Sequence, residues 1–566
     1  MELGQDDDAT ESERATGLEA MGPVAGRRLC WTLSLNLVAF GAHLCACGCF
    51  VYLPPLLRRA EFSEQARAAV LGLGPLLCVL GVPLVGSWSD ACTSRLGRRR
   101  PFLLGIGALL ALSLAGVAYG ESLRNVMGAN AHRAILATST VLLDFASQAL
   151  LNPCQALVCD LVPDVDFGFA VYSFALSLGG VLGYLLSGLD WTNTALGQAG
   201  QERAVFLLLL SVFTACLALN LLVAGEKPAA RTDEYVVLSQ ANDHDVLVER
   251  PMDRLLVVGA CDANGGLCST PEVPVRKKSQ ESPGRHPNGL VQHLRKTHWH
   301  KMSTKDVVRT ALSAALLFVC NAFCNVFITF PSWLASCLRL DVLTSVPGPL
   351  RTLFVFQLLA WMAVMSHYVY FTDFTGEVLF HGRPEQTASP ADKLLYDRGV
   401  RAGSWGLLVH CVASSVYSLC FQWRLTARLG QRVGLYTAMG SFALALPGLL
   451  LFTNVGALLT LSAVTGLASA ALDSIPYVLA CFYCANKQDY FQGAKHQPGV
   501  GQCLAVLDTA EYLAQVLLSM FMGYTIYATG TVASYVCVST LCAVAACYAC
   551  SRVACPPRTK NVELYP

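Results

Sequence analysis

Long apolar runs separated by short polar segments dominate the chain. A transmembrane helix needs about 20 predominantly apolar residues, and runs of that length fall into two groups. The runs of the first group begin near Leu29, Arg67, Phe102, Ala134, Phe169 and Arg203. The runs of the second group begin near Leu350, Ser404, Gly434, Val455, Gln502 and Thr531. The pattern predicts an all-α membrane protein whose twelve transmembrane helices form two six-helix bundles.

The polar segments divide this arrangement into five parts. We expect a cytosolic N-terminal tail, a first bundle, a cytosolic central loop, a second bundle and a cytosolic C-terminal tail at residues 1–28, 29–224, 225–349, 350–551 and 552–566. The first stretch is acidic, unlike the basic start of a signal peptide, so we interpret the first apolar run as a true span. The central loop is rich in basic residues, Ser, Pro and Gly, which is typical of flexible linkers.

One further apolar run, residues 311–335, is long enough to be counted as a span by hydropathy alone. The basic loops at 94–100 and 423–432 share an Arg-Leu-Gly-x-Arg pattern, and the positive-inside rule assigns both to the cytosol. A thirteenth span between them would place one of the two outside. We therefore interpret 311–335 as an interfacial or re-entrant helix on the cytosolic face. The alternative is a thirteenth helix that inverts everything after it.

Composition supports a membrane protein and excludes several other classes. Hydrophobic residues make up 54% of the chain and charged residues only 14%, with a mean hydropathy of +0.48, which is too apolar for a soluble protein of this size. The net charge of +1 gives no reason to expect a nucleic-acid partner. Most of the 24 cysteines lie in or beside apolar runs, where thiols behave as small apolar side chains. We expect neither a disulfide framework nor a metal site.

The loop after the second run carries a specific motif. In GSWSDACTSRLGRR, residues 86–99, a glycine and an acidic residue precede the basic cluster. This resembles the loop motif of the major facilitator superfamily, in which the glycine permits close helix approach, the acidic residue caps and pairs, and the arginines anchor the cytosolic gate. The motif residues here are Gly86, Asp90, Arg95, Gly97, Arg98 and Arg99. The second half keeps Arg428, Gly430 and Arg432 without the preceding glycine and aspartate, so its gate should be weaker or differently held.

Longer strings narrow the resemblance. LGPLLCVLGVPLVGSWSD at 73–90, GRRRPF at 97–102, SLGGVLGYLLSGLDW at 177–191 and FTDFTGE at 371–377 are similar to solute carrier family 45, the animal relatives of plant sucrose carriers, and in particular to its prostein-like branch. The resemblance implies a twelve-helix carrier, which we expect to be a monomer in the plasma membrane by default, with a vesicular membrane as the alternative. It would move sucrose, glucose or a related sugar together with a proton by alternating access, with the proton as coupling ion and no cofactor.

A proton-coupled carrier needs a titratable group at membrane depth, where charged side chains are costly and normally face the bundle interior. In the fourth run, Asp144, Gln148 and Gln155 are 4 and 11 residues apart, which brings them within about 40° of one helix face. Pro153 lies within this polar stripe and should kink the helix. We take Asp144 as the leading acceptor of a proton or a sugar hydroxyl, and a hydrogen bond between helices as the alternative.

Other polar positions complete the candidate site. Asp508 and Gln515 share a face of the eleventh span, with Glu511 about 60° away. Asp373, where the seventh span ends, could bind sugar hydroxyls, close an outer gate or cap a helix. Trp361 could form an aromatic platform for a sugar ring, as could Tyr184, Tyr368 and Tyr477, although belt or packing roles are open for each.

Three positions depart from the family pattern. His43 stands where relatives usually show glutamate or glutamine, and a histidine titrates nearer neutral pH. Gln155 stands where the plant carriers show arginine, which puts the usual charge pairing in doubt. Asp473 is an additional acidic group that could take over the lost role. The candidates for proton coupling are thus Asp144, His43, Asp473 and Asp508, and those for substrate binding are Gln148, Gln155, Trp361, Asp373, Glu511 and Gln515.

Two other classes of function stay open. The same fold carries cationic and other small metabolites, for which the acidic residues would serve as counter-charges. A non-transporting membrane sensor or scaffold is the second alternative, and the changes at His43 and Gln155 are what such a loss would look like. An enzyme is not expected, because the sequence shows no nucleotide-binding loop, metal-ligand cluster or nucleophile arrangement.

Overall fold

The computed structural model describes residues 26–50, 52–189, 201–225, 346–383, 389–452, 454–491 and 498–556. The chain divides into two compact units, of which the first joins the residues before 233 to those after 308. Every described residue belongs to that first unit. The second unit, residues 233–308, and the interfacial helix predicted at 311–335 lie outside the described residues.

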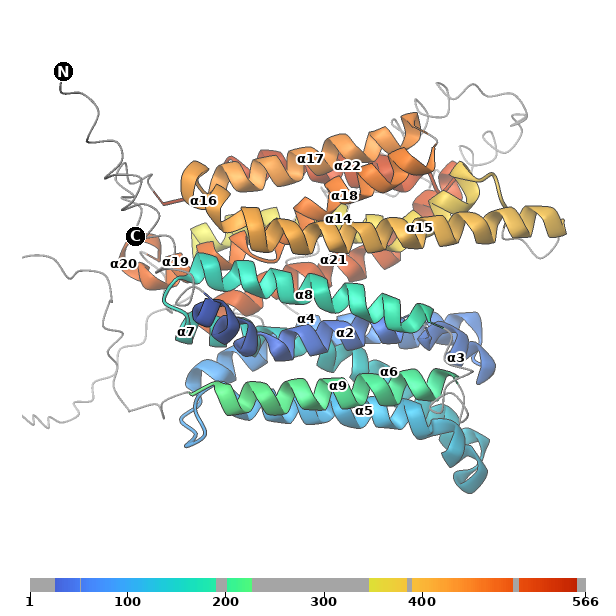
Figure 1. Cartoon of the computed structure of the whole chain (residues 1–566), viewed down its shortest axis with the longest axis horizontal. Coiled ribbons are helices and arrows are strands. Elements are labelled where there is room, and N and C mark those ends of the chain that lie inside the picture. Colours follow the sequence, from blue (N-terminus) through green and yellow to red (C-terminus); the bar gives the residue numbers. More distant parts are fainter. Residues whose placement is uncertain are drawn as a thin grey trace, which may run out of the picture. The chain divides into compact units, whose positions relative to one another are not determined.

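The first half contains six spanning segments (Figure 1). Its opening segment is bent by 53° between Gly26–Leu35 and α2. The helices are α2 (Leu37–Phe50), the short α3 (Leu53–Arg59), α4 (Glu64–Ala91), α5 (Arg100–Met127), α6 (Ala129–Ala149) continued by α7 (Leu151–Leu161), α8 (Val165–Gly188) and α9 (Gln201–Val223).

The second half repeats the arrangement. Its helices are α14 (Gly348–Phe374) with the π-helical turn η3 (Thr375–Leu379), α15 (Pro390–Tyr417) continued by η4 (Ser418–Gln422) and α16 (Trp423–Leu429), α17 (Gln431–Leu451), α18 (Val455–Leu472) continued by α19 (Ile475–Ala485), the short α20 (Lys487–Tyr490), α21 (Val500–Thr529) and α22 (Ser534–Cys550). Ten segments of the described residues are long and apolar enough to span a membrane. The bent first segment and the 17-residue α22 bring the number to twelve, which confirms the predicted fold.

Local sequence sets where several helices begin. Side chains at the N-cap accept a hydrogen bond from a backbone N–H of the first turn, which would otherwise lack a partner. Such caps are made by Ser63 for α4, Asp164 for α8, Ser389 for α15 and Asn454 for α18. Each cap lies next to a span, so the polar residue that ends a loop also fixes the start of the apolar helix.

The repeated Arg-Leu-Gly-x-Arg pattern produces the same turn in both halves. Gly97 and Gly430 have φ values of +107° and +88°. This region is one that residues with a side chain rarely adopt, so glycine is required for the turn. The sequence repeat is therefore a structural repeat.

The fourth span of each half is interrupted, at Leu150 between α6 and α7 and at residues 473–474 between α18 and α19. A proline follows each break. Pro153 and Pro476 lack the N–H that would bond the carbonyl four residues earlier. In the second half that freed carbonyl belongs to Leu472, and it accepts a hydrogen bond from the buried Gln357 side chain at 3.4 Å. The predicted disturbance at Pro153 thus has a counterpart in the second half.

The most extensive packing between the halves is that of α4 on α21 and of α8 on α15. Gly86 makes the first pair close: a Cβ atom there would lie 2.6 Å from the Gly501 carbonyl oxygen and 2.8 Å from the Ala505 Cβ. The small residue therefore lets α4 approach the beginning of α21, as the motif predicts.

Replacing Gly86 by alanine is expected to destabilise the protein by about 1–3 kcal/mol, because the added methyl group meets a backbone oxygen that cannot rotate away. The measurement is the melting temperature of the purified protein in detergent. Gly72 lies in the same helix, and a Cβ atom added there would meet no other atom within 4 Å, so Gly72→Ala is the matched control. Equal melting temperatures for the two variants would contradict the close packing of α4 on α21.

Candidate functional site

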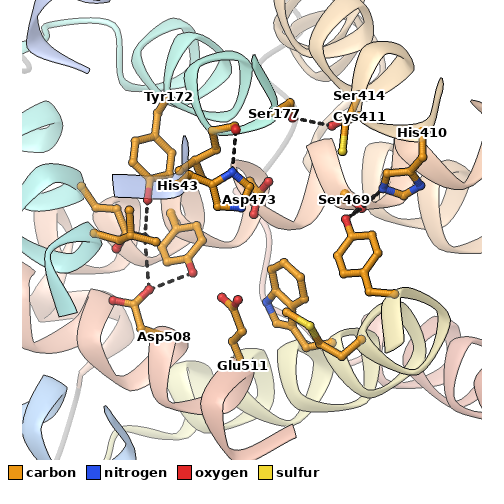
Figure 2. Close-up of a pocket in the computed structure, with 17 residues that line it drawn as sticks. His43, Tyr172, Ser177, His410, Cys411, Ser414, Ser469, Asp473, Asp508 and Glu511 are labelled. Carbon is orange, nitrogen blue, oxygen red and sulfur yellow. Dashed lines mark hydrogen bonds between the residues drawn. The ribbon is translucent and has the colours of Figure 1, made fainter. Parts of the chain in front are cut away.

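A cavity of about 80 Å³ lies between the halves, with room for several water molecules. Both halves line it (Figure 2). The first half contributes side chains from α2, α7 and α8, and the second half from α14, α15, α18, α19, α21 and the segment at the α18–α19 break. The polar and aromatic residues that line it are His43, Gln155, Tyr172, Ser177, Trp361, Tyr368, His410, Ser414, Ser469, Asp473, Tyr477, Asp508 and Glu511.

Asp508 is held by three side chains. Its carboxylate accepts hydrogen bonds from Asn152 Nδ2 at 3.0 Å, Gln155 Nε2 at 3.1 Å and Tyr477 Oη at 2.9 Å. Gln155 also donates to the Tyr172 hydroxyl at 3.1 Å. Only 2% of Asp508 is exposed. These amide and phenol groups thus supply hydrogen bonds to the buried carboxylate. They also join α7 of the first half to α19 and α21 of the second.

Glu511 and Asp473 are less constrained. Within the described part of the chain, neither carboxylate has a hydrogen bond, and the Glu511 carboxylate points into the cavity in Figure 2. Figure 2 shows the His43 ring beside Asp473. His43 Nδ1 lies 2.7 Å from the Leu176 carbonyl oxygen, which can only accept, so Nδ1 carries a proton. Two carboxylates and an imidazole therefore face the same small space.

The opposite wall is a hydrogen-bonded aromatic cluster. The Tyr368 hydroxyl lies 2.9 Å from His410 Nε2 and 2.7 Å from Ser469 Oγ, and His410 Nδ1 lies 2.7 Å from Thr465 Oγ1. Trp361 Nε1 has no hydrogen-bond partner among the described residues. The wall therefore offers rigidly held hydroxyl groups and an indole N–H with which a bound molecule could form hydrogen bonds.

Asp144 and Gln148 do not line this cavity. They bond to each other, Gln148 Nε2 donating to Asp144 Oδ1 at 2.7 Å. Asp144 lies against Gly74 of α4, and Tyr512 of α21 donates to the Gln148 carbonyl oxygen at 3.1 Å. The three residues share a helix face but lie at different depths, because 11 residues of helix separate the ends of the stripe by about 16 Å along the axis. Gln155 reaches the cavity and the other two lie under α4 and α21.

Asp373 and Gln515 also lie outside the lining. Asp373, near the end of α14, accepts a hydrogen bond from Tyr396 Oη of α15 at 2.7 Å. Gln515 Nε2 lies 4.0 Å from the sulfur of Met365, which does line the cavity. Their roles in substrate binding and outer closure stay predictions.

The loop motif forms a compact ion-pair cluster. Arg99 is fully buried, and its guanidinium contacts Asp90 at 2.8 Å, Asp160 at 2.9 Å and Ser89 Oγ at 2.6 Å. Arg98 pairs with Asp160 at 2.8 Å. We refer to this end of the bundle, which carries residues 92–99, as the loop end.

Asp90 extends the cluster to the second half. Its two carboxylate oxygens accept the backbone N–H groups of Gly501 at 3.0 Å and Gln502 at 2.9 Å. These residues begin α21, where free N–H groups and the helix dipole favour a negative charge. Asp90 therefore caps a helix of the opposite half while it holds Arg99.

The remaining predicted gate residues do not enter this cluster. Arg95 is exposed and Gly97 shapes the turn. In the second half Arg428 lies at the end of α16, and Arg432 donates to the Val553 carbonyl oxygen at 2.6 Å. The second gate is thus held differently, as the missing glycine and aspartate indicate.

Several site residues escaped the sequence analysis. Asn152, Tyr172, His410 and Ser469 occur singly in apolar helices, where no pattern marks them. Asp160 could have been found, because it is an acidic residue at the end of the fourth span, on the same side of the membrane as the basic loop. Pairing of that charge with Arg98 and Arg99 follows from topology alone.

Comparison with known proteins identifies the family. A model of the major facilitator superfamily matches residues 35–373. The chain belongs to that superfamily. It is 32% identical to the mouse protein solute carrier family 45 member 3 over 470 residues, which cover 81% of this chain and 70% of the mouse protein. The chain is thus a member of solute carrier family 45, a multi-pass membrane transporter.

More distant relatives extend the comparison. The human proton-associated sugar transporter A is 24% identical over 617 residues, covering 88% of this chain and 82% of that protein. The human membrane-associated transporter protein is 26% identical over 528 residues, covering 90% of this chain and 91% of that protein.

Solved structures agree on the fold. The human organic anion transporter MFSD10 has a TM-score of 0.50 at 15% identity, covering 93% of this chain and 99% of that chain. A bacterial homologue of the iron transporter ferroportin, in an outward-facing state, has a TM-score of 0.50 at 12% identity, covering 92% of this chain and 99% of that chain. At these identities the likeness concerns the fold alone.

Proposed function

We propose that this protein is a proton-coupled sugar symporter that works by alternating access. The observation that carries the proposal is the cavity between the halves, in which carboxylates stand beside aromatic rings. A sugar presents hydroxyl groups at its edges and an apolar face, which suit carboxylate, amide and hydroxyl partners together with a ring such as Trp361. The name of the human relative, proton-associated sugar transporter A, supports the same substrate class.

The position of the cavity between the halves supports movement between states. A substrate reaches or leaves such a site when the halves part on one side of the membrane. At the loop end Asp90 joins the halves in this conformation, because its carboxylate accepts the backbone N–H groups of Gly501 and Gln502 and is itself held by Arg99. Access from the opposite end, followed by opening of the loop end, would complete the transport cycle.

The carboxylates of the cavity would have different roles. Asp508 already accepts three hydrogen bonds, so it would fasten the halves and orient Gln155 and Tyr477. Glu511, without a hydrogen bond from the described residues, would carry the proton, and Asp473 with His43 would respond to its charge. The protein would act as a monomer in the plasma membrane or a vesicular membrane, with the sugar as its small-molecule partner.

A carrier of organic cations is the second candidate. Among the described residues, three carboxylates line the cavity, at Asp473, Asp508 and Glu511, and neither lysine nor arginine does. An ammonium group would be attracted to such carboxylates and to the faces of Trp361 and Tyr368. This excess of acidic groups is the specific observation that favours a cation over a neutral sugar.

Uptake into proteoliposomes distinguishes the two candidates. Proteoliposomes of the purified protein, with a lumen at pH 7, are given labelled sucrose, glucose or spermidine. An outside pH of 6 creates an inward proton gradient, and an outside pH of 7 provides the condition without a gradient. For a symporter of one proton, each unit of pH difference supplies about 1.4 kcal/mol, enough for about tenfold accumulation. We expect sugar to accumulate only with the gradient.

A proton uncoupler is the control for this experiment, since it should remove the accumulation without changing the protein. Accumulation of spermidine with no uptake of either sugar would contradict the sugar proposal and favour the cation carrier. No uptake of any of the three, from protein shown to be folded by its melting transition, would contradict both candidates.

A further inference from the structure

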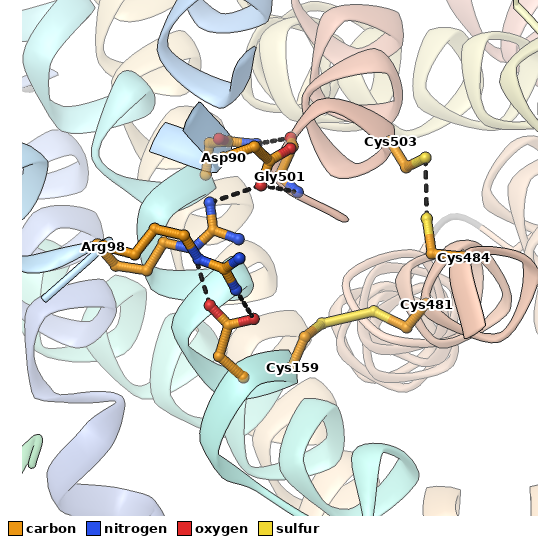
Figure 3. The surroundings of a disulfide bond; sticks show 10 residues. Asp90, Arg98, Cys159, Cys481, Cys484, Gly501 and Cys503 are labelled. Atoms are coloured by element: carbon orange, nitrogen blue, oxygen red, sulfur yellow. Dashed lines mark hydrogen bonds and ion pairs between the residues drawn. A yellow bond between two sulfur atoms is a disulfide. The ribbon is translucent and has the colours of Figure 1, made fainter. Parts of the chain in front are cut away.

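A disulfide links the two halves at the loop end. It joins Cys159 of α7 to Cys481 of α19, two residues that are 322 positions apart in the sequence (Figure 3). We propose that this pair is an oxidation site whose disulfide clamps the loop end shut and stops the transport cycle. The proposal rests on alternating access as the proposed function and adds a means of control to it.

The position of the pair gives the bond its effect. Cys159 immediately precedes Asp160, which holds Arg98 and Arg99. Cys481 lies one helical turn beyond Tyr477, which bonds Asp508. The bond therefore lies near Asp90, which Arg99 holds and which accepts the backbone N–H groups of Gly501 and Gln502 of the second half.

Geometry explains why the bond acts as a clamp. The Cα atoms of the two cysteines are 6.9 Å apart, at the upper edge of the range that disulfides span. Opening of the loop end requires α7 and α19 to move apart, which an intact disulfide does not allow. When the two thiols are reduced, noncovalent contacts such as the hydrogen bonds from Gly501 and Gln502 to Asp90 oppose opening, and those can break and re-form in each cycle.

The chemistry requires a two-electron oxidant, and we assign this role to hydrogen peroxide. One thiol attacks the peroxide oxygen, the O–O bond breaks, and a sulfenic acid and one water form. The second thiol then attacks that sulfur, the S–S bond forms and a second water leaves with both remaining protons. A dithiol reductant reverses the reaction by exchange. Both residues are partly exposed, so a small oxidant and reductant can reach them.

A second pair of cysteines provides an internal contrast. Cys484 of α19 and Cys503 of α21 have sulfur atoms 3.0 Å apart, and both are buried. Both belong to the second half, so a bond between them would not join the halves. Removal of Cys484 should therefore leave the clamp intact.

The first test asks whether the bond joins the halves. A protease site is introduced within residues 233–308 of the full-length protein, which is oxidised with hydrogen peroxide in liposomes, cleaved, and run on a non-reducing gel. We expect the halves of the parent protein and of Cys484→Ser to migrate together, and those of Cys159→Ser and Cys481→Ser to separate. Separation in the parent protein, or joined halves in the Cys159→Ser variant, would overturn the proposal.

The second test asks whether the bond holds the loop end closed, and it needs no substrate. Hydrogen exchange of peptides from α7 and α19 is compared before and after oxidation. Slower exchange is expected in the parent protein and unchanged exchange in Cys159→Ser. Equal exchange in the oxidised and reduced parent protein would overturn the clamp even if the bond forms.

Uptake then links the clamp to transport. Oxidation should remove most of the uptake in the parent protein, dithiothreitol should restore it, and Cys159→Ser should be insensitive to both. Full uptake by protein whose halves are joined would overturn the regulatory role. If no substrate is transported at all, the proposed function fails while the gel and exchange results still decide the clamp.

Discussion

Replacing Arg99 by methionine is expected to lower both the stability and the transport rate more than any other change in the loop motif. The arginine side chain is fully buried and pairs with Asp90 and Asp160. Removing one partner of a buried ion pair costs about 3–5 kcal/mol, because the remaining charges stay buried without compensation. Methionine fills a similar volume without donating hydrogen bonds, so the loss is electrostatic rather than a cavity effect.

If the closed state alone is destabilised by about 3 kcal/mol, the equilibrium ratio of closed to open states falls about a hundredfold. The carrier would then rest with its loop end open. The measurements are the melting temperature and the initial uptake rate of the substrate identified in proteoliposomes. Both are expected to fall.

Arg98→Met is the matched control. Arg98 is the neighbouring residue and binds the same Asp160, but a quarter of its side chain is exposed. Partly exposed ion pairs contribute about 0–1 kcal/mol, so this variant should lose far less stability. Equal losses for the two variants would contradict the special position of Arg99.

The fold and the loop motif were accessible to sequence reasoning because each has a signal that repeats or is specific. Twelve apolar runs give twelve spans, and the Arg-Leu-Gly-x-Arg pattern gives Gly97 and Gly430 the same backbone turn. Asp90 and Arg99 could be paired in advance because the motif places them in one short loop. The structure brings these two together as that interpretation predicts.

The detailed site could not be predicted, because helical periodicity gives the direction of a side chain but not its depth or its neighbours. Asp144 and Gln155 share a helix face, yet only Gln155 reaches the cavity. The partners of Asp508 come from α7 and α19, far away in the sequence. The contact of Cys159 with Cys481 likewise depends on packing between the halves, so no spacing in the sequence marks this pair.

Replacing Glu511 by glutamine is expected to abolish accumulation of sugar while exchange of sugar across the membrane continues. Glutamine has nearly the same shape and can still hydrogen bond to a sugar hydroxyl, but it cannot take up a proton. Without the proton the gradient no longer drives the cycle, so the about tenfold accumulation per unit of pH difference should fall to simple equilibration. The measurements are gradient-driven uptake and exchange of labelled against unlabelled sugar.

Two variants serve as comparisons for Glu511→Gln. Asp508→Asn should impair accumulation and exchange together, because Asp508 holds Asn152, Gln155 and Tyr477 in place. Asp144→Asn should keep accumulation, because Asp144 lies outside the cavity and is bonded to Gln148. Loss of accumulation in Asp144→Asn, with normal accumulation in Glu511→Gln, would indicate that Asp144 of the fourth span carries the coupled proton instead. Normal accumulation in both would instead point to Asp473 and His43, which also face the cavity.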